Sequence, residues 1–241
     1  MKQRFPSLII LCLVATFFVG CSTSYRVRVD ALSTVEGPEP VGQTYELVSA
    51  TPGVQEGDLF FKEVVRHLRP VLSGRNYYPV GEGKTADLQI AVNAYLSDPL
   101  TETESYNEPI FMETAARYRT IRVPVVNDKG NVVSYSYSTY WLPPRTHVAG
   151  WVDRNRQITV YDKILHLSAR RILNEKEVSG EIWAIKIALR GESTDYRSAL
   201  PYMLVAAAPY VGKRTAGEEV IIIREDSEEV QSYRAGLSDG R

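Results

Sequence analysis

The chain has 241 residues, of which 44% are apolar, enough to form the core of one large domain or two small ones. Basic and acidic residues nearly balance, with 28 lysines and arginines against 29 aspartates and glutamates. This near balance, together with the absence of a basic run in the sequence, argues against nucleic acid as a partner.

The first 20 residues have the layout of an export signal that is later removed. A positively charged start and a 12-residue apolar run (residues 8–19) precede Gly20 and Cys21. The run is shorter than the about 20 apolar residues that a membrane-spanning helix needs. Because Cys12 lies inside the signal, removal of the signal leaves Cys21 as the single cysteine, and no disulfide forms within one mature chain.

The stretch from Phe18 to Cys21 resembles the lipobox of bacterial lipoproteins. This resemblance implies that the Cys21 thiol becomes an S-diacylglycerol thioether, that the signal is cut before it, and that the new amine is acylated, for example with palmitate. Several acyl chains hold a protein stably on a membrane, since each buried CH₂ contributes about 0.8 kcal/mol. Ser22, in place of Asp, implies by the same resemblance the outer membrane of a Gram-negative bacterium, facing the periplasm. A soluble secreted protein and an uncleaved anchor are the alternatives.

One domain is predicted between residues 43 and 224, after a tether at 21–42 in which residues 25–30 alternate like a short strand. Two helices are indicated by apolar residues at helical spacing, at 57–74 and 195–212. Strands are indicated at 43–49, 87–96, 118–126, 132–141, 157–168, 180–189 and 219–224.

Two segments rich in charge are predicted to lack regular structure. Residues 97–115 are acidic and are interpreted as a solvated loop, because their spacing does not match a calcium-binding loop. Residues 225–241 are charged and poor in apolar side chains, which predicts a disordered tail.

A projecting β-hairpin is predicted as an insertion at about 116–142. Its two strands are joined by Asn127–Asn131, whose Asn and Gly residues suit a positive φ. Alternation places Tyr135, Tyr137 and Trp141 on one face. Aromatic side chains with polar tips suit contacts with proteins or glycans, and cross-strand packing within the hairpin is the alternative. The candidate partner-binding residues are Tyr135, Tyr137, Tyr140, Trp141 and Trp151, and Arg145 and Arg154 lie near them.

The segments Asp87–Ile90 and Leu200–Leu204, together with the long paired strands, resemble envelope lipoproteins that are grouped as a domain of unknown function. The resemblance covers about residues 43–224 and implies an α+β fold with helices on one side of a sheet. It implies no enzymatic activity and no catalytic residues. The predicted fold is therefore α+β, with a mainly antiparallel sheet, two helices packed on one face and a projecting β-hairpin.

No motif for catalysis or cofactor binding is found in the sequence. The glycines of 81–85 resemble part of a phosphate-binding loop, but Tyr78 stands where its first glycine belongs. The chain has no His-Glu-x-x-His pattern, no paired cysteines with zinc spacing and no Gly-x-Ser-x-Gly elbow. No catalytic residue, metal site or cofactor is therefore expected.

The sequence thus favours a non-enzymatic, lipid-anchored protein that supports the cell envelope or binds an envelope protein or glycan. Two alternatives of other classes stay open. One is a lipid or glycolipid binding or transfer protein, in which a sheet and two helices enclose an apolar ligand. The other is an envelope hydrolase, whose serine, histidine and carboxylate would come together from distant loops.

Overall fold

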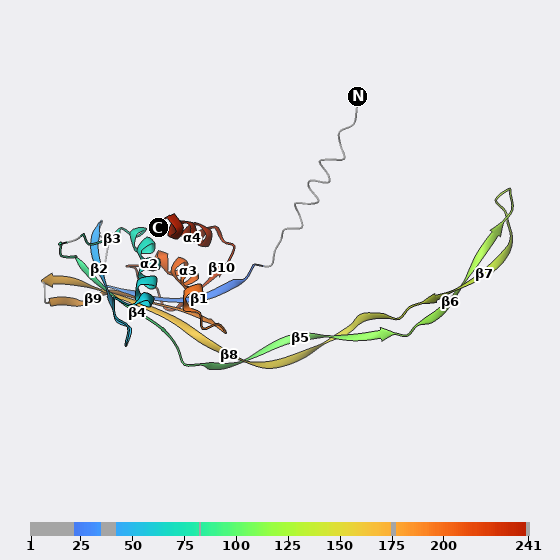
Figure 1. Ribbon diagram of the computed structural model, residues 1–241, viewed down its shortest axis with the longest axis horizontal. Helices are drawn as coiled ribbons and strands as arrows, with labels where there is room; N and C mark the ends of the chain where they lie inside the picture. The colour runs from blue at the N-terminus through green and yellow to red at the C-terminus, as the bar shows by residue number, and fades with distance from the viewer. Residues whose placement is uncertain (1–21, 35–41, 82, 175–176, 240–241) are drawn as a thin grey trace, which may run out of the picture. The chain divides into compact units, whose positions relative to one another are not determined.

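The computed structural model describes residues 22–34, 42–81, 83–174 and 177–239, which divide into two compact units (Figure 1). We call the first unit the body; it comprises the described residues up to Leu100 and from Thr159 onward. We call the second unit the arm; it comprises Thr101–Ile158. Cys21 lies outside the described residues, so the lipid anchor stays a prediction.

The body is built on a mixed β-sheet with the strand order β10-β1-β9-β8-β4-β2-β3. All neighbours from β10 to β4 are antiparallel, whereas β2 runs parallel to both β4 and β3. The predicted α+β class is confirmed, but the sheet is not purely antiparallel. The strands are β1 (Ser24–Ser33), β2 (Gln43–Ser49), β3 (Tyr77–Pro79), β4 (Leu88–Leu96), β8 (Arg145–Asn174, whose residues from Thr159 onward belong to the body), β9 (Glu177–Gly191) and β10 (Glu219–Arg224).

The parallel pairs follow from the connection between β2 and β3. Helix α2 (Leu59–Ser73) lies between these two strands in the chain. Two neighbouring strands run parallel only if the chain returns to the end of the sheet at which the first strand began. The crossover through α2 makes this return after β2. The predicted helix at 57–74 and the predicted strands at 43–49 and 87–96 are therefore confirmed, and their pairing supplies the parallel part of the sheet.

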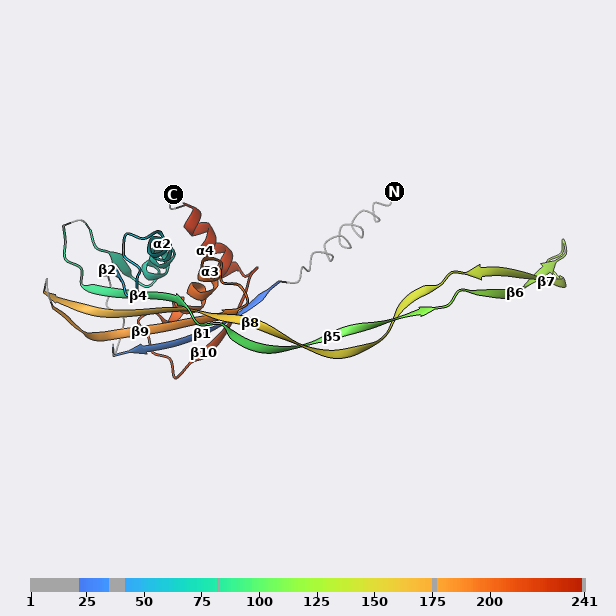
Figure 2. The ribbon, with the colours of Figure 1, turned by 60° about the horizontal axis from the view of Figure 1, so that its bottom comes forward.

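Helices cover one face of the body's sheet (Figure 2). They are α2, α3 (Tyr196–Ala207), which continues into a 3₁₀ turn at Ala208–Tyr210, and α4 (Glu228–Asp239). Helix α3 contacts α2, α4, β1 and β9. Its start is fixed by Asp195, whose side chain accepts a hydrogen bond of 3.0 Å from the backbone N–H of Arg197, the usual role of an aspartate before a helix.

The core of the body lies between this helical layer and the sheet. Inward residues of β9 alternate along the strand, and Trp183, Ile185 and Ile187 are all buried. They belong to one buried cluster with Leu68 of α2 and Leu200 of α3. Burial of such large apolar side chains is the main force that holds the body together, at about 1.5–3 kcal/mol each.

The segment predicted to be a tether contributes a strand to this sheet. β1 pairs antiparallel with both β10 and β9, and Val27, Val29 and Ala31 on it are buried. The alternation within residues 25–30 was the correct signal, because period-two apolar residues suit a strand with one buried face. The prediction that residues 21–42 form only a tether is therefore wrong for Ser24–Ser33.

The tail predicted to be disordered forms helix α4 in its described part. Val230 on this helix is fully buried, and the Tyr233 hydroxyl donates a hydrogen bond of 2.8 Å to the backbone oxygen of His67 in α2. Arg234 donates to the Tyr202 hydroxyl of α3 at 2.8 Å. The low apolar content misled the prediction, because the contacts of this helix with the core come from only a few side chains, among them Val230, Tyr233 and Arg234.

The arm consists of β5 (Leu100–Thr114), β6 (Arg117–Val126), β7 (Val132–Leu142) and the first part of β8. β5 pairs with β8, and β6 pairs antiparallel with β7. At the turn, the Asn127 side-chain oxygen accepts hydrogen bonds of 3.0 Å from the backbone N–H groups of Lys129 and Asn131, and Gly130 has φ +80°. The predicted hairpin is confirmed at its turn, but the acidic segment 97–115 is mostly strand, and the arm is longer than 116–142.

One prediction concerns Gly212, which follows the 3₁₀ turn. Its φ is +75°, and a Cβ there would lie 2.7 Å from the Tyr77 hydroxyl oxygen. Gly212→Ala is expected to lower the free energy of unfolding by roughly 1–3 kcal/mol, because alanine is strained in this backbone conformation and must displace a buried ring. Gly53 has the same φ with nothing within 4 Å. Gly53→Ala is the control in urea denaturation, and equal losses for both variants would contradict the contact with Tyr77.

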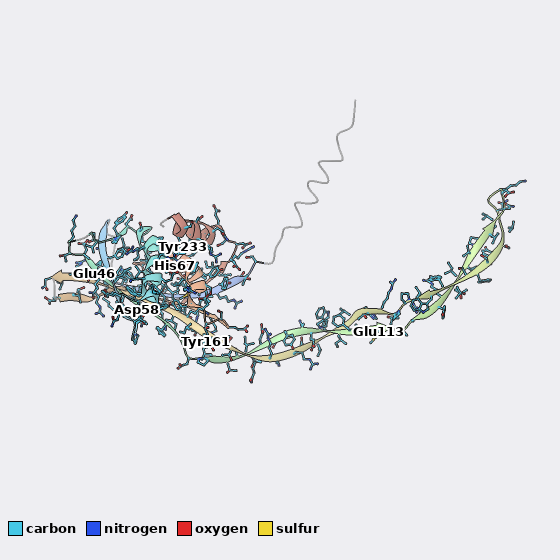
Figure 3. The ribbon with its side chains drawn as sticks, in the orientation of Figure 1. Glu46, Asp58, His67, Glu113, Tyr161 and Tyr233 are labelled. Atoms are coloured by element: carbon cyan, nitrogen blue, oxygen red, sulfur yellow. The ribbon has the colours of Figure 1, made fainter. Side chains whose placement is uncertain are left out.

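A second prediction concerns His67 of α2, whose ring lies against that of Tyr233 of α4; both residues are labelled in Figure 3. Its Nδ1 lies 3.0 Å from the Tyr233 hydroxyl and its Nε2 lies 3.5 Å from a Glu63 oxygen. Burial lowers the pKa of His67, and this outweighs the opposing effect of Glu63. The folded protein therefore holds the neutral ring, while the unfolded chain takes up a proton near pH 6.5.

The stability of the body should consequently fall as the pH drops from about 6.5 toward the lower pKa of folded His67. Urea denaturation between pH 5 and pH 7 measures this slope. In the His67→Gln variant, which has no titrating ring, the slope should be shallower even though the variant is less stable overall. An unchanged slope would show that another group dominates the pH dependence.

Candidate interaction surface

The five aromatic residues predicted to bind a partner all lie on the arm and are all exposed. Tyr137 is 71% exposed, Trp151 64% and Trp141 54%, while Tyr135 and Tyr140 retain 48% and 38%. Contiguous exposed apolar patches are uncommon on protein surfaces that contact only water. The five residues share the arm but not one strand, because four lie on β7 and Trp151 lies on β8.

The register of β6 and β7 shows which of these residues share a face. Tyr118 lies opposite Trp141, Arg122 opposite Tyr137, and Pro124 opposite Tyr135. Because side chains alternate along a strand, these three pairs lie on one face of the ribbon. Tyr140, opposite Arg119, lies on the other face. The predicted common face of Tyr135, Tyr137 and Trp141 agrees with this register.

Arginine side chains are interleaved with the aromatic rings. The Arg122 guanidinium carbon lies 3.4 Å from the centre of the Tyr135 ring, and that of Arg156 lies 6.0 Å from the Tyr106 ring. Such cation–π contacts contribute about 0.5–1 kcal/mol at exposed sites. Aromatic residues and arginine are the two classes most enriched at the centres of protein interfaces.

Ion pairs between β5 and β8 hold the other part of the arm. Arg154 contacts Glu108 at 2.9 Å, and Arg156 contacts Glu104 at 2.6 Å. All four side chains are well exposed, so each pair contributes at most about 1 kcal/mol. Figure 3 shows side chains, Glu113 among them, standing along both sides of this ribbon with no second layer of the arm over them.

The sequence prediction missed a second apolar group on the arm, in the acidic segment. Ile110, Phe111 and Met112 of β5 are 47%, 65% and 57% exposed, and Tyr106 is 44% exposed. The run of three large apolar residues between Glu108 and Glu113 was the available signal. The surrounding glutamates obscured it, because they favour a solvated loop.

Two titratable groups buried in the body, Asp162 and Lys163, are paired within the fold. Asp162 accepts two hydrogen bonds of 2.8 Å from Arg190 and lies 3.1 Å from Arg28, and these arginines hold its pKa below the ordinary value. Lys163 is 2% exposed and donates to the backbone oxygen of Ser193. Burial lowers the Lys163 pKa. These contacts stabilise the sheet and do not assemble a nucleophile with a base.

Two features of the described residues bear on the alternatives of other classes. An open groove of about 780 Å³ lies beside α2 and is lined partly by Glu46, Lys62, Arg66 and Arg69, unlike the enclosed apolar cavity of a lipid carrier. His147 lies 3.4 Å from the Thr114 hydroxyl on the exposed arm. Within the described residues, no three or more His, Cys, Asp or Glu side chains are placed to hold a metal ion.

No family model and no curated protein matches the chain. Among solved structures, a PDZ domain protein from Parabacteroides distasonis aligns with a TM-score of 0.36 and 9% identity, over 88% of this chain and 42% of that chain. The present chain thus spans less than half the length of that protein, and a likeness at this level supports no conclusion about function. Across the part of the chain that the structure describes, every helix is too short or too polar to cross a membrane.

Proposed function

We propose that this chain is a non-enzymatic binding protein of the cell envelope, with the arm as its contact element and the body as its scaffold. The observation that carries the proposal is the exposure of the arm's large apolar side chains, with Tyr118 at 76%, Tyr137 at 71% and Phe111 at 65%. Exposure of so many large apolar side chains to water on one unit indicates a surface that a partner covers.

The two-stranded construction of the arm supports the same proposal. A lone two-stranded ribbon is marginally stable in water, because neither face has a layer to pack against. Its two edges also carry backbone N–H and C=O groups that invite another strand or chain. A partner that covers the aromatic face would supply the missing layer.

The lipobox resemblance supports the outer membrane as the location of this contact. A lipid on Cys21 would confine the protein to the outer membrane and raise its concentration near partners in the envelope. Metabolic labelling with a palmitate analogue tests this part. The wild type should carry the label and Cys21→Ser should not, whereas an unlabelled wild type would remove the anchor from the proposal.

The contact role of the arm is tested by shortening it. Deleting residues 117–142 removes β6, the turn and β7 and leaves Ala115, Ala116, Pro143 and Pro144 as a connection between β5 and β8. Chemical crosslinking in cells, followed by capture of the full chain, should give adducts for the wild type and none for the shortened chain. Retention of every adduct by the shortened chain would refute the proposal.

A point variant with a matched control tests the surface without shortening the chain. Tyr137→Ser should weaken the adducts, because Tyr137 is 71% exposed on the aromatic face of the arm. Tyr78→Ser removes an exposed tyrosine from the body, where Tyr78 is 45% exposed, and should leave the adducts unchanged. An equal effect of both substitutions would mean that the contact is not specific to the arm.

A further inference from the structure

Charge is divided along the length of the arm. The basal half, residues 101–114 and 149–158, carries five acidic and two basic side chains, a net charge of −3. The distal half, residues 115–148, carries five basic and one acidic side chain, a net charge of +4 with histidine neutral. Both basic side chains of the basal half, Arg154 and Arg156, are already engaged with Glu108 and Glu104. The arm therefore has an acidic half and a basic half.

The charge pattern of one arm is complementary to that of a second arm that runs in the opposite direction. If two arms lie side by side and antiparallel, the basic half of each faces the acidic half of the other, and the two-fold axis makes the contact twice. If they lie parallel, acid faces acid and base faces base, which is repulsive. We propose that the partner of the arm is the arm of a second copy of this chain, packed antiparallel to it. This inference rests on the proposed function.

The apolar side chains fit this arrangement because both halves carry them. An antiparallel pair places the apolar group of one half over that of the other and covers both, which supplies the layer that a lone ribbon lacks. The exposed large apolar residues of the basal half are Tyr106, Ile110, Phe111, Met112 and Trp151, and the exposed aromatic residues of the distal half are Tyr118, Tyr135, Tyr137, Tyr140 and Trp141.

The charge division also favours a second copy over other occupants. An anionic membrane or glycan would attract the distal half but repel the basal half, so it would engage only part of the exposed apolar surface. A second arm satisfies both halves at once. Charge complementarity of this kind mainly fixes the register and orientation of an interface, while apolar burial supplies most of the affinity.

The test exchanges the charges of each half in the full chain, purified in detergent and examined by sedimentation velocity. Arg117→Glu, Arg119→Glu and Arg145→Glu together change the distal half from +4 to −2. Glu113→Lys and Asp153→Lys together change the basal half from −3 to +1. All five side chains are exposed. We expect the wild type to dimerise, each variant alone to dimerise at least about tenfold more weakly, and an equal mixture of the two variants to recover the dimer.

The matched control reverses three exposed charges on the body, with Lys84→Glu, Lys213→Glu and Arg214→Glu. This control should dimerise like the wild type. A wild type that stays monomeric, a dimer that survives both sets of arm reversals, or a mixture that fails to recover the dimer would each overturn the antiparallel arm pair.

The outcome separates this inference from the proposed function. If the purified wild type is monomeric but deletion of residues 117–142 still removes adducts in cells, the partner is another molecule and only the second-copy inference fails. If neither self-association nor the adducts depend on the arm, both fail. Recovery of the dimer in the mixed sample supports both.

Discussion

Replacing Trp183 by alanine is expected to cost the body about 3–5 kcal/mol of unfolding free energy, which is a large share of the about 5–15 kcal/mol of a typical domain. Trp183 is 2% exposed in β9, with its ring centre 6.0 Å from that of Tyr77. The substitution removes one of the largest buried side chains and leaves a cavity that the surrounding sheet and helices fill only in part.

A tryptophan-to-alanine substitution on the arm should leave the stability of the body nearly unchanged and weaken association instead. Trp141 is 54% exposed in β7, so Trp141→Ala should change the stability of the body by no more than about 0.5 kcal/mol. It should instead weaken association through the arm. Urea denaturation measures the first effect and sedimentation measures the second.

The pair of variants separates a core role from a contact role for residues of the same type. If Trp141→Ala destabilised the body as much as Trp183→Ala, the arm's aromatic residues would be structural. If Trp141→Ala changed neither stability nor association, this ring would have no place in the contact.

The parts of the fold that were predictable are those in which burial creates a pattern. Helix α2 shows apolar residues at helical spacing because Val64, Leu68 and Val71 face the core. The turn of the hairpin was predictable from local chemistry, since Asn127 and Gly130 have roles that do not depend on distant contacts.

The parts that were missed bury little, and so leave no apolar period. β5 begins with glutamates alternating with Thr and Ser and continues with Ile110, Phe111 and Met112 in a row, so no period-two apolar signal indicates a strand there. The strand pairings that make the sheet mixed join residues far apart in the chain, such as Tyr45 of β2 with Leu88 of β4. No local pattern specifies such a pairing.

The candidate surface was predictable in its aromatic residues but not in its extent. Tyr135, Tyr137 and Trp141 stand out because alternation puts them on one face. The charge division of the arm emerges only when β5 is known to pair with β8, which brings Glu104 next to Arg156 and Glu108 next to Arg154. Composition alone sums these charges to nearly zero and hides the division.

Helix α4 allows the sharpest test of a segment whose composition indicated disorder. Val230 is fully buried against the core cluster, so Val230→Asp would place a carboxylate where no water reaches it. We expect a loss of about 3–5 kcal/mol, because the body must either bury the charge or release the helix. Release would also break the hydrogen bond from Tyr233 to His67.

Ser232→Asp provides the control, because it introduces the same residue two positions later on the exposed side of the same helix. It should change the free energy of unfolding by no more than about 0.5 kcal/mol. Urea denaturation compares the two variants, and hydrogen exchange of the α4 amides shows whether the helix has left the body. Equal and negligible effects would mean that the tail contributes nothing to stability, which is the behaviour that its charged composition predicts. A large loss for Val230→Asp alone would show that burial of one apolar side chain near the start of a charged segment is needed to dock that segment on the core.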